Sequence, residues 1–342
     1  MSSMESSGVM TPMSIPSPPA EWRSFNIGAW LRDLGLDWFA LNISINAYAL
    51  FILLGIVFAI LIVNHRLTSR GAEPWIVVDI ALWAVPLGIL GGRLFHVVTH
   101  PSDYFFAGAD LLRVFYIWEG GLAIFGALLG GALGAWIGTR MTGIRFWSFA
   151  DALAPGLLIA QASGRLGNYF NQELFGAPTD LPWGLEIDPG NPAIPVGLPT
   201  ETLFHPTFAY EALWNLLGAL VIIAATRKLG LQWGKAFALY LIWYGIGRFT
   251  LEFLRLDVAE VILGLRANQW AAIAAVVLGL LIIAVQRGRH PGSEPSVYRP
   301  GKEWEPEDEV ESEERYRVEE LLADSRSASE TTTSGKPSAN DK

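Results

Sequence analysis

The run AYALFILLGIVFAILIV at residues 47–63 contains no charged residue, and a single glycine, Gly55, interrupts its apolar side chains. Inside lipid there is no water to satisfy backbone N–H and C=O groups, so an isolated run of this kind must be helical. Roughly 20 residues are needed to cross a bilayer, and the flanking residues supply what this run lacks. The run therefore predicts a membrane-spanning helix.

Six further apolar runs of similar length follow, at residues 75–98, 120–138, 146–161, 206–225, 236–253 and 268–285. The whole chain is 51% hydrophobic and 17% charged, whereas a soluble domain usually carries about 25% charged residues. Together these observations predict an all-α integral membrane protein with about seven transmembrane helices.

Basic residues are concentrated in alternate short loops, which marks the cytoplasmic side of a membrane protein. The other loops are poorer in basic residues and carry only Arg113, Arg165, Arg255 and Arg266. This alternation predicts that the N-terminus lies outside and the C-terminus in the cytoplasm. The basic loops carry Arg66, Arg70, Arg140, Arg145, Arg227, Lys228, Lys235, Arg287 and Arg289.

The chain divides into three parts by composition. Residues 1–44 form an N-terminal tail without the features of a signal peptide, and its residues 22–39 mix aromatic and charged side chains as an interfacial helix does. Residues 45–287 hold the seven predicted spans, with one long outward-facing loop at 163–203. Residues 288–342 carry 14 acidic and 8 basic residues, and they predict an acidic, disordered cytoplasmic tail.

Charged residues inside a membrane are costly and often functional. The stretch GRLGNYFNQELFG at 164–176 places such residues among glycines at a membrane exit. Arg165 offers planar donors that suit a phosphate, and Asn168 and Asn171 would share a helical face. We expect this stretch to recognise an anionic phospholipid head group. The structural alternative is that the charged residues form ion pairs that hold the helices together.

The same stretch closely resembles the signature of the prolipoprotein diacylglyceryl transferase family, and further blocks of that family follow in order between residues 45 and 287. The family resemblance implies transfer of the diacylglyceryl group of phosphatidylglycerol to the lipobox cysteine of a prolipoprotein, which forms a thioether and releases glycerol-1-phosphate. It also implies a multi-pass protein of the bacterial inner membrane. The further blocks are NAYAL at 46–50, GGR at 91–93, WEGG at 118–121, DALAP at 151–155, HPT at 205–207 with Tyr210 and Glu211, and RFTLEFLR at 248–255.

The resemblance also suggests roles for particular residues. Arg165 and Arg248 match two essential arginines of the family and are expected to bind the phosphate. Glu252 lies one helical turn beyond Arg248 and would be its ion-pair partner. Tyr48 would donate a hydrogen bond to the lipid or help to move a proton, and its alternative is an aromatic residue that only lines the site. The other substrate-binding candidates, with Glu173 expected to orient an arginine, are Asn168, Asn171, Glu173, Gly176 and Arg93.

One departure from the family concerns the proton acceptor. Many members carry a histidine that is proposed as the base at the position of Phe125, and a phenyl ring accepts no proton. His96 follows Arg93 by three residues on the same helical face and is our candidate catalytic histidine, and His205 is the other histidine close to a span. A third possibility is that arginines alone lower the thiol pKa. We expect activity to depend on Arg165 and Arg248 and not on a single histidine.

Other classes of function predict features that the sequence lacks. A transporter or channel for an anionic substrate predicts internal repeats, and none is evident. An intramembrane serine protease needs a glycine two residues before Ser163, and Gln161 stands there. A scaffold role leaves the glycine-rich stretch unexplained. The sequence has no cysteine, and we expect no metal or organic cofactor and no nucleic acid partner. The expected partners are phosphatidylglycerol, lipobox signal peptides and the bilayer.

Overall fold

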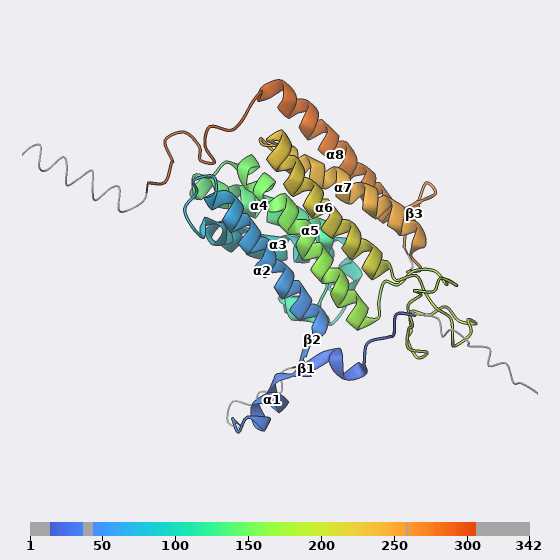
Figure 1. Ribbon diagram of the computed structural model, residues 1–342. Coiled ribbons are helices and arrows are strands. Elements are labelled where there is room, and N and C mark those ends of the chain that lie inside the picture. The colour runs from blue at the N-terminus through green and yellow to red at the C-terminus, as the bar shows by residue number, and fades with distance from the viewer. Residues whose placement is uncertain (1–13, 37–43, 258, 306–342) are drawn as a thin grey trace, which may run out of the picture.

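The computed structural model describes residues 14–36, 44–257 and 259–305, and helices dominate it (Figure 1). Each of the seven apolar runs coincides with a long helix, as the hydropathy pattern predicts. These helices are α2 (Ala47–Thr68), α3 (Ile76–Thr99), α4 (Ile124–Met141), α5 (Phe146–Asn171), α6 (Thr207–Leu229), α7 (Lys235–Leu251) and α8 (Ala267–Arg289).

Five of the long helices, α2, α3, α4, α6 and α8, are long and apolar enough to cross a membrane. The helix α7 has 17 residues, and α5 contains polar side chains such as Asp151 and Arg165. The molecule is therefore a mostly helical, multi-span membrane protein.

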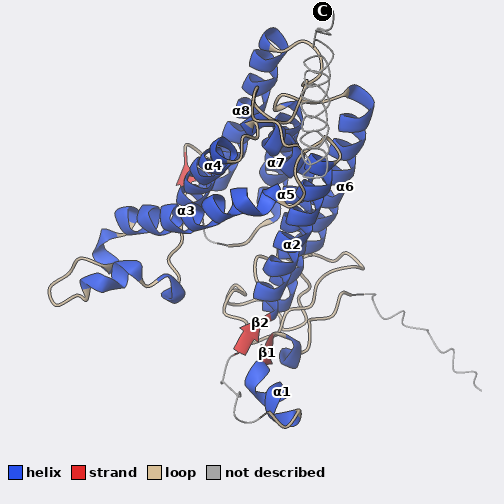
Figure 2. Ribbon diagram, turned by 90° about the vertical axis from the view of Figure 1, so that its left-hand side faces the viewer, coloured by secondary structure: helices blue, strands red, loops and turns tan. Residues whose placement is uncertain are grey.

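The long helices form a group around α5 and a separate hairpin. Helix α5 packs against α2, α6 and α7, and α7 packs against α8. Helices α3 and α4 pack chiefly against each other, and Figure 2 shows them projecting from the side of the other helices. Their link to the group is a buried cluster that includes Leu67 of α2, Ile80 of α3 and Phe149 of α5.

Glycines bring α3 and α4 into close contact. They recur every four residues along one face of α4, at Gly126, Gly130, Gly134 and Gly138. A Cβ atom on Gly130 would lie 2.1 Å from the carbonyl oxygen of Leu87 in α3. In a membrane, where apolar surface gains little from association, such close backbone packing is a main source of helix–helix attraction.

Asp151 of α5 begins the neighbouring helix α7. Its carboxylate accepts hydrogen bonds from the backbone N–H of Gly234, at 2.8 Å, and of Phe237, at 2.9 Å. These are donors of a helix N-terminus that have no partner within the helix. The DALAP block at 151–155 therefore fixes how α7 sits on α5, and so helps to position Arg248 near the other end of α7.

The segment after α8 packs against the rest of the molecule, so the prediction of a disordered tail from residue 288 is wrong for residues 294–299. Glu294 accepts hydrogen bonds from Ser148, at 2.6 Å, and from the N–H of Trp233, at 2.8 Å, and pairs with Arg70. Val297 and Tyr298 are buried. The acidic composition of residues 288–342 as a whole conceals this short stretch, whose side chains have specific partners. Residues 306–342 lie outside the described residues.

The N-terminal region differs from the single interfacial helix expected at 22–39. It contains a 3-10 turn η1 (Ala20–Trp22), the strand β1 (Ser24–Asn26) and the short helix α1 (Ile27–Asp33), and β1 pairs antiparallel with β2 (Ser44–Asn46). Residues 37–43 lie outside the described part. The exposed side chains of Trp22, Phe25 and Trp30 still give this region an apolar surface.

The connection between α5 and α6 begins later than the sequence predicted, because α5 continues to Asn171. The rest of the connection is held by a small core of Phe175, Leu185, Ile187 and Phe204. The other short elements are η3 (Pro101–Asp103), η4 (Leu111–Phe115), η5 (Ile117–Glu119), η6 (Glu252–Leu254), β3 (Val261–Ile262) and β4 (Leu265–Arg266).

Candidate functional site

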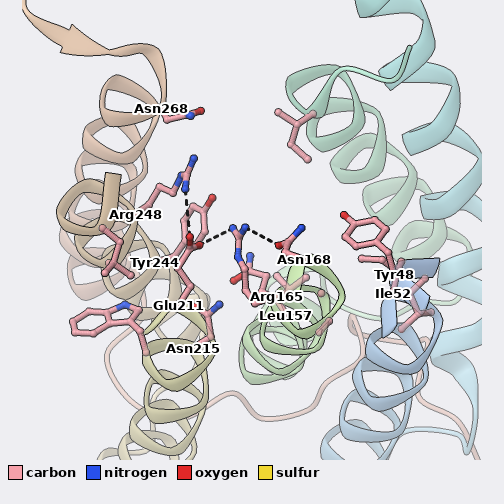
Figure 3. A pocket seen from close by; sticks show the side chains of 18 residues that line it. Tyr48, Ile52, Leu157, Arg165, Asn168, Glu211, Asn215, Tyr244, Arg248 and Asn268 are labelled. Carbon is pink, nitrogen blue, oxygen red and sulfur yellow. Dashed lines mark hydrogen bonds and ion pairs between the residues drawn. The ribbon is translucent and has the colours of Figure 1, made fainter. Parts of the chain in front are cut away.

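A cavity of about 480 Å³ opens between α2, α5, α6, α7 and α8 (Figure 3). One wall carries Tyr48 and Ile52 of α2, and the opposite wall carries Arg248 of α7 and Asn268 at the start of α8. Arg165 of α5 and Glu211 of α6 lie between these walls. The cavity therefore combines an apolar side with a charged side, as a site for an anionic lipid requires.

Glu211 connects the two arginines that the sequence singled out. Its Oε2 lies 2.7 Å from Nη2 of Arg165, and its Oε1 lies 3.9 Å from Nη1 of Arg248. Figure 3 shows the carboxylate between the two guanidinium groups. The expectation that Arg165 and Arg248 lie close together is thus met by the fold, and Glu211 is the residue that joins them.

The expected ion pair between Arg248 and Glu252 is present. Nη2 of Arg248 lies 2.9 Å from Oε2 of Glu252, whose side chain is fully buried. Glu252 is also held by Nε of Arg266 at 3.2 Å and by Nδ2 of Asn268 at 3.0 Å. Nη1 of Arg248 is buried and has no hydrogen-bond partner among the described residues. Arg248 is therefore anchored by Glu252 on one side, and its Nη1 makes only the longer ion pair with Glu211.

Two further ionic residues extend the network behind the cavity. Nη1 of Arg255 lies 3.8 Å from Glu211, and its Nε lies 2.6 Å from Asp257. Burial acts to raise the pKa of Asp257, but the hydrogen bond and charge of Arg255 outweigh it and hold that pKa below its usual range. The network then holds four arginines and three carboxylates. The four guanidinium groups favour an anionic ligand.

The end of α5 organises the signature stretch around Glu173. Asn168 donates a hydrogen bond to Oε1 of Glu173 at 2.8 Å, and Asn171 donates to the same oxygen at 3.3 Å. The prediction that the two asparagines share a face is confirmed. Nη1 of Arg165 donates to Oδ1 of Asn168 at 3.3 Å, so Glu173 orients Arg165 through Asn168 and not by direct contact.

Two tryptophans connect helices α6 and α7 next to the ion-pair network. Nε1 of Trp214 donates to the carbonyl of Trp243 at 3.1 Å, and Nε1 of Trp243 donates to the carbonyl of Trp214 at 3.0 Å. Gly218 and Gly247 leave room for the two indole rings. Since Trp214 follows Glu211 by one helical turn and Gly247 precedes Arg248, this reciprocal contact sets the spacing of those two charges.

The structure does not bring Arg93 and His96 to this cavity. Arg93 is buried and donates to the carbonyl oxygens of Val114, Gly120, Gly121 and Arg113, at 2.7, 2.6, 3.2 and 2.5 Å respectively. It thereby holds the connection between α3 and α4. His96 stacks on His100 and lines a second cavity with Arg93. The spacing of three residues correctly predicted that Arg93 and His96 lie close to each other. It did not predict that both lie away from Arg165.

Three other positions from the sequence lie near the site without lining the cavity. Gly176 is packed so closely that a Cβ atom there would lie 2.7 Å from the Cβ of His205 and 2.8 Å from the carbonyl oxygen of Leu254. His205 lies 3.4 Å from the hydroxyl of Tyr210. Phe125 of α4 packs against Phe95 of α3.

Several residues of the site were not among the sequence candidates. Glu211 was named only within the family block that opens the fifth span, without a role. Its position inside a span is a signal that could have found it, because a buried carboxylate needs a cationic partner. Arg255 was named as a loop charge and within the block at 248–255, and Arg266 only as a loop charge. Arg266 reaches Glu252 from β4, whose pairing with β3 the sequence did not predict. Polar residues that line the deeper part of the cavity were also missed, and these are Gln161, Asn215 and Tyr244.

Comparison with known proteins identifies the family. The model of the family described as prolipoprotein diacylglyceryl transferase matches residues 37–285. The chain belongs to this family. A phosphatidylglycerol–prolipoprotein diacylglyceryl transferase of Leifsonia xyli is 56% identical over 334 residues, which cover 95% of this chain and 96% of the relative. One from Rhodococcus jostii is 42% identical over 328 residues, which cover 87% and 90%.

A further relative, phosphatidylglycerol–prolipoprotein diacylglyceryl transferase 2 of Streptomyces coelicolor, is 47% identical over 252 residues, which cover 74% of this chain and 79% of the relative. As a member of the diacylglyceryl transferase family, the chain is an enzyme that transfers diacylglyceryl groups from phosphatidylglycerol to prolipoproteins. The transporter, protease and scaffold alternatives are set aside by this membership.

Proposed function

We propose that the cavity between α2, α5, α6, α7 and α8 is where phosphatidylglycerol meets the lipobox cysteine. The observation that supports this most strongly is the placing of Arg165 and Arg248 on either side of Glu211 at one cavity wall. Fixed cations in a site of low dielectric stabilise the charge of a phosphate more strongly than water-exposed cations do. Ile52 and Leu157 among the lining residues suit the apolar part of the lipid.

In the proposed reaction the sulfur of the lipobox cysteine attacks the glyceryl carbon that carries the phosphate. A sulfur–carbon bond forms as the carbon–oxygen bond breaks, and the bonding electrons leave with glycerol-1-phosphate. The thiol must first lose its proton to water or to a group in the site, because the thiolate is the nucleophile. Arg165 and Arg248 bind the phosphate and stabilise the charge that gathers on it, and their field also favours the thiolate.

We further infer that all seven long helices cross the bilayer, with the N-terminus outside and the C-terminus in the cytoplasm. Helices α5 and α7 pack among helices that are themselves long and apolar enough to cross. The basic loops support this orientation. In a bacterial inner membrane the connection at 172–206 then faces outward, and the arginines lie where the outer leaflet and the signal peptide of a prolipoprotein can both reach them.

The cavity is tested by filling it. Ile52 lines the cavity, and its neighbour Leu53 points elsewhere and is 55% exposed. Ile52→Trp is expected to lower transfer at least about tenfold, which corresponds to about 1.4 kcal/mol of transition-state stabilisation. The measurement is the mass gain of a lipobox peptide incubated with phosphatidylglycerol and the purified protein. Leu53→Trp is the control and should keep its rate. Equal rates for the two variants would place the reaction outside this cavity.

The role of histidine is tested by separate replacements of His96 and His205. A general base usually contributes a factor of about 10² to 10⁴ in rate. His96 lines a different cavity, and His205 contacts Tyr210, so neither faces Arg165. We expect His96→Gln and His205→Gln each to retain activity within about threefold, measured as transfer to a lipobox peptide. If one variant loses turnover while its unfolding temperature is unchanged, that histidine is the base.

A further inference from the structure

Glu211 lies at the wall of the cavity, and its carboxylate is shared by three arginines. The distances are 2.7 Å to Arg165, 3.9 Å to Arg248 and 3.8 Å to Arg255. Every contact that the structure records for the Glu211 side chain among the described residues is one of these ion pairs. Among the described residues, the position of the carboxylate therefore depends on the arginines.

The second carboxylate of the network, Glu252, is built differently. It is 1% exposed, does not line the cavity, and is held from behind by Arg266 and Asn268 as well as by Arg248. Glu252 therefore anchors Arg248. Glu211 lines the cavity beside the faces of Arg165 and Arg248 that a ligand must reach.

We propose that Glu211 competes with phosphate for Arg165 and Arg248, a proposal that rests on the phosphate site described above. In the empty enzyme Glu211 pairs with Arg165. The phosphate of the lipid displaces the carboxylate when phosphatidylglycerol binds. Glu211 pairs with Arg165 again when glycerol-1-phosphate leaves.

The charges of substrate and product explain the value of such competition. The phosphodiester of phosphatidylglycerol carries one negative charge. The phosphomonoester of glycerol-1-phosphate carries about −1.5 to −2 at neutral pH. Repulsion from Glu211 therefore acts more strongly on the product than on the substrate, so the carboxylate promotes product release.

The competition also sets the apparent affinity of the site. If the arginines are free of Glu211 for only a fraction of the time, the apparent dissociation constant of an anion rises by the inverse of that fraction. Removing the carboxylate charge should therefore tighten anion binding. A carboxylate that merely held the arginines in position would have the opposite effect, because its loss would release Arg165 from its place.

The test measures inhibition of transfer by added glycerol-1-phosphate, with the full chain in phosphatidylglycerol-containing vesicles. For Glu211→Gln we expect the inhibition constant to fall about tenfold, with a smaller fall in KM for phosphatidylglycerol and a fall in kcat. Glu211→Asp keeps the charge but moves it away from Arg165, and should lie between wild type and Glu211→Gln. Glu201→Gln, an exposed change of the same charge, should match wild type.

The failures of the two proposals differ. Weaker inhibition of both Glu211→Gln and Glu211→Asp would overturn the competition, provided that Arg165→Gln still relieves inhibition. Absence of inhibition in wild type, together with unchanged kcat/KM in Arg165→Gln, would overturn the phosphate site itself. Should Glu211→Gln fail to fold, the inhibition constant of Glu211→Asp alone decides the direction.

Discussion

Replacement of Arg248 by glutamine or by lysine is expected to lower kcat/KM for diacylglyceryl transfer by about a hundredfold or more. The guanidinium uses one nitrogen to bind Glu252, and its Nη1 has no hydrogen-bond partner in the part of the chain that the structure describes. Lysine carries the charge but lacks the planar fork that reaches a carboxylate and a phosphate together. The measurement is the initial rate of mass gain of a lipobox peptide over a range of phosphatidylglycerol concentrations.

The protein is expected to remain folded when Arg248 is replaced, because its partners keep other cations. Glu252 retains Arg266, and Glu211 retains Arg165 at 2.7 Å. Arg287→Gln, at an exposed position near the end of α8, is the control and should keep its rate. Transfer by Arg248→Gln at the wild-type rate would remove Arg248 from the phosphate site.

Gly130→Ala is expected to lower the stability of the protein strongly for so small a change in volume. Its Cβ would lie 2.1 Å from the carbonyl oxygen of Leu87, and backbone cannot move aside as a flexible side chain does. Overpacking of this kind costs typically about 1–3 kcal/mol, and more where no relaxation is possible. We expect a lower unfolding temperature in detergent and a lower yield of folded protein.

The adjacent Gly131 provides a matched control. A Cβ atom there has no neighbour closer than 3.8 Å, the carbonyl oxygen of Ala84. Alanine is favoured over glycine in a helix by up to about 1 kcal/mol, so Gly131→Ala should unfold at the wild-type temperature or above it. If both variants unfold at the same temperature, the close packing of α3 on α4 does not contribute to stability as we infer.

Much of the fold follows from hydropathy, and what does not follow has identifiable causes. The apolar run at 47–63 forms most of α2, as predicted, because the backbone groups of an isolated segment in lipid can be satisfied only in a helix. The polar signature at 164–176 was taken as mostly loop, yet α5 continues to Asn171. Its asparagines bind Glu173 just beyond the helix end, so the polar side chains stabilise this last turn.

Part of the site was also predictable from the sequence. Arg165 and Arg248 could be placed together because both lie near the C-terminal ends of neighbouring helices, and family resemblance selected them. Arg93 could not be placed, because the buried cluster of Leu67, Ile80 and Phe149 links the α3–α4 hairpin to the other helices, and hydropathy does not predict the angle of that link. The sequence therefore did not determine where the α3–α4 hairpin lies relative to the other helices.

The packed segment after α8 has a consequence for how the chain is made. Residues 294–298 are translated after all seven long helices, yet they supply hydrogen-bond partners of Arg145 and Ser148, at the start of α5, and of Trp233, just before α7. Until residues 294–298 have been synthesised, the polar groups of these earlier residues are exposed to water at the membrane surface. Assembly of this face is therefore completed only after α8 has been synthesised. A chain that stopped at the end of α8 would lack the contacts of Val297 and Tyr298 with the start of α3.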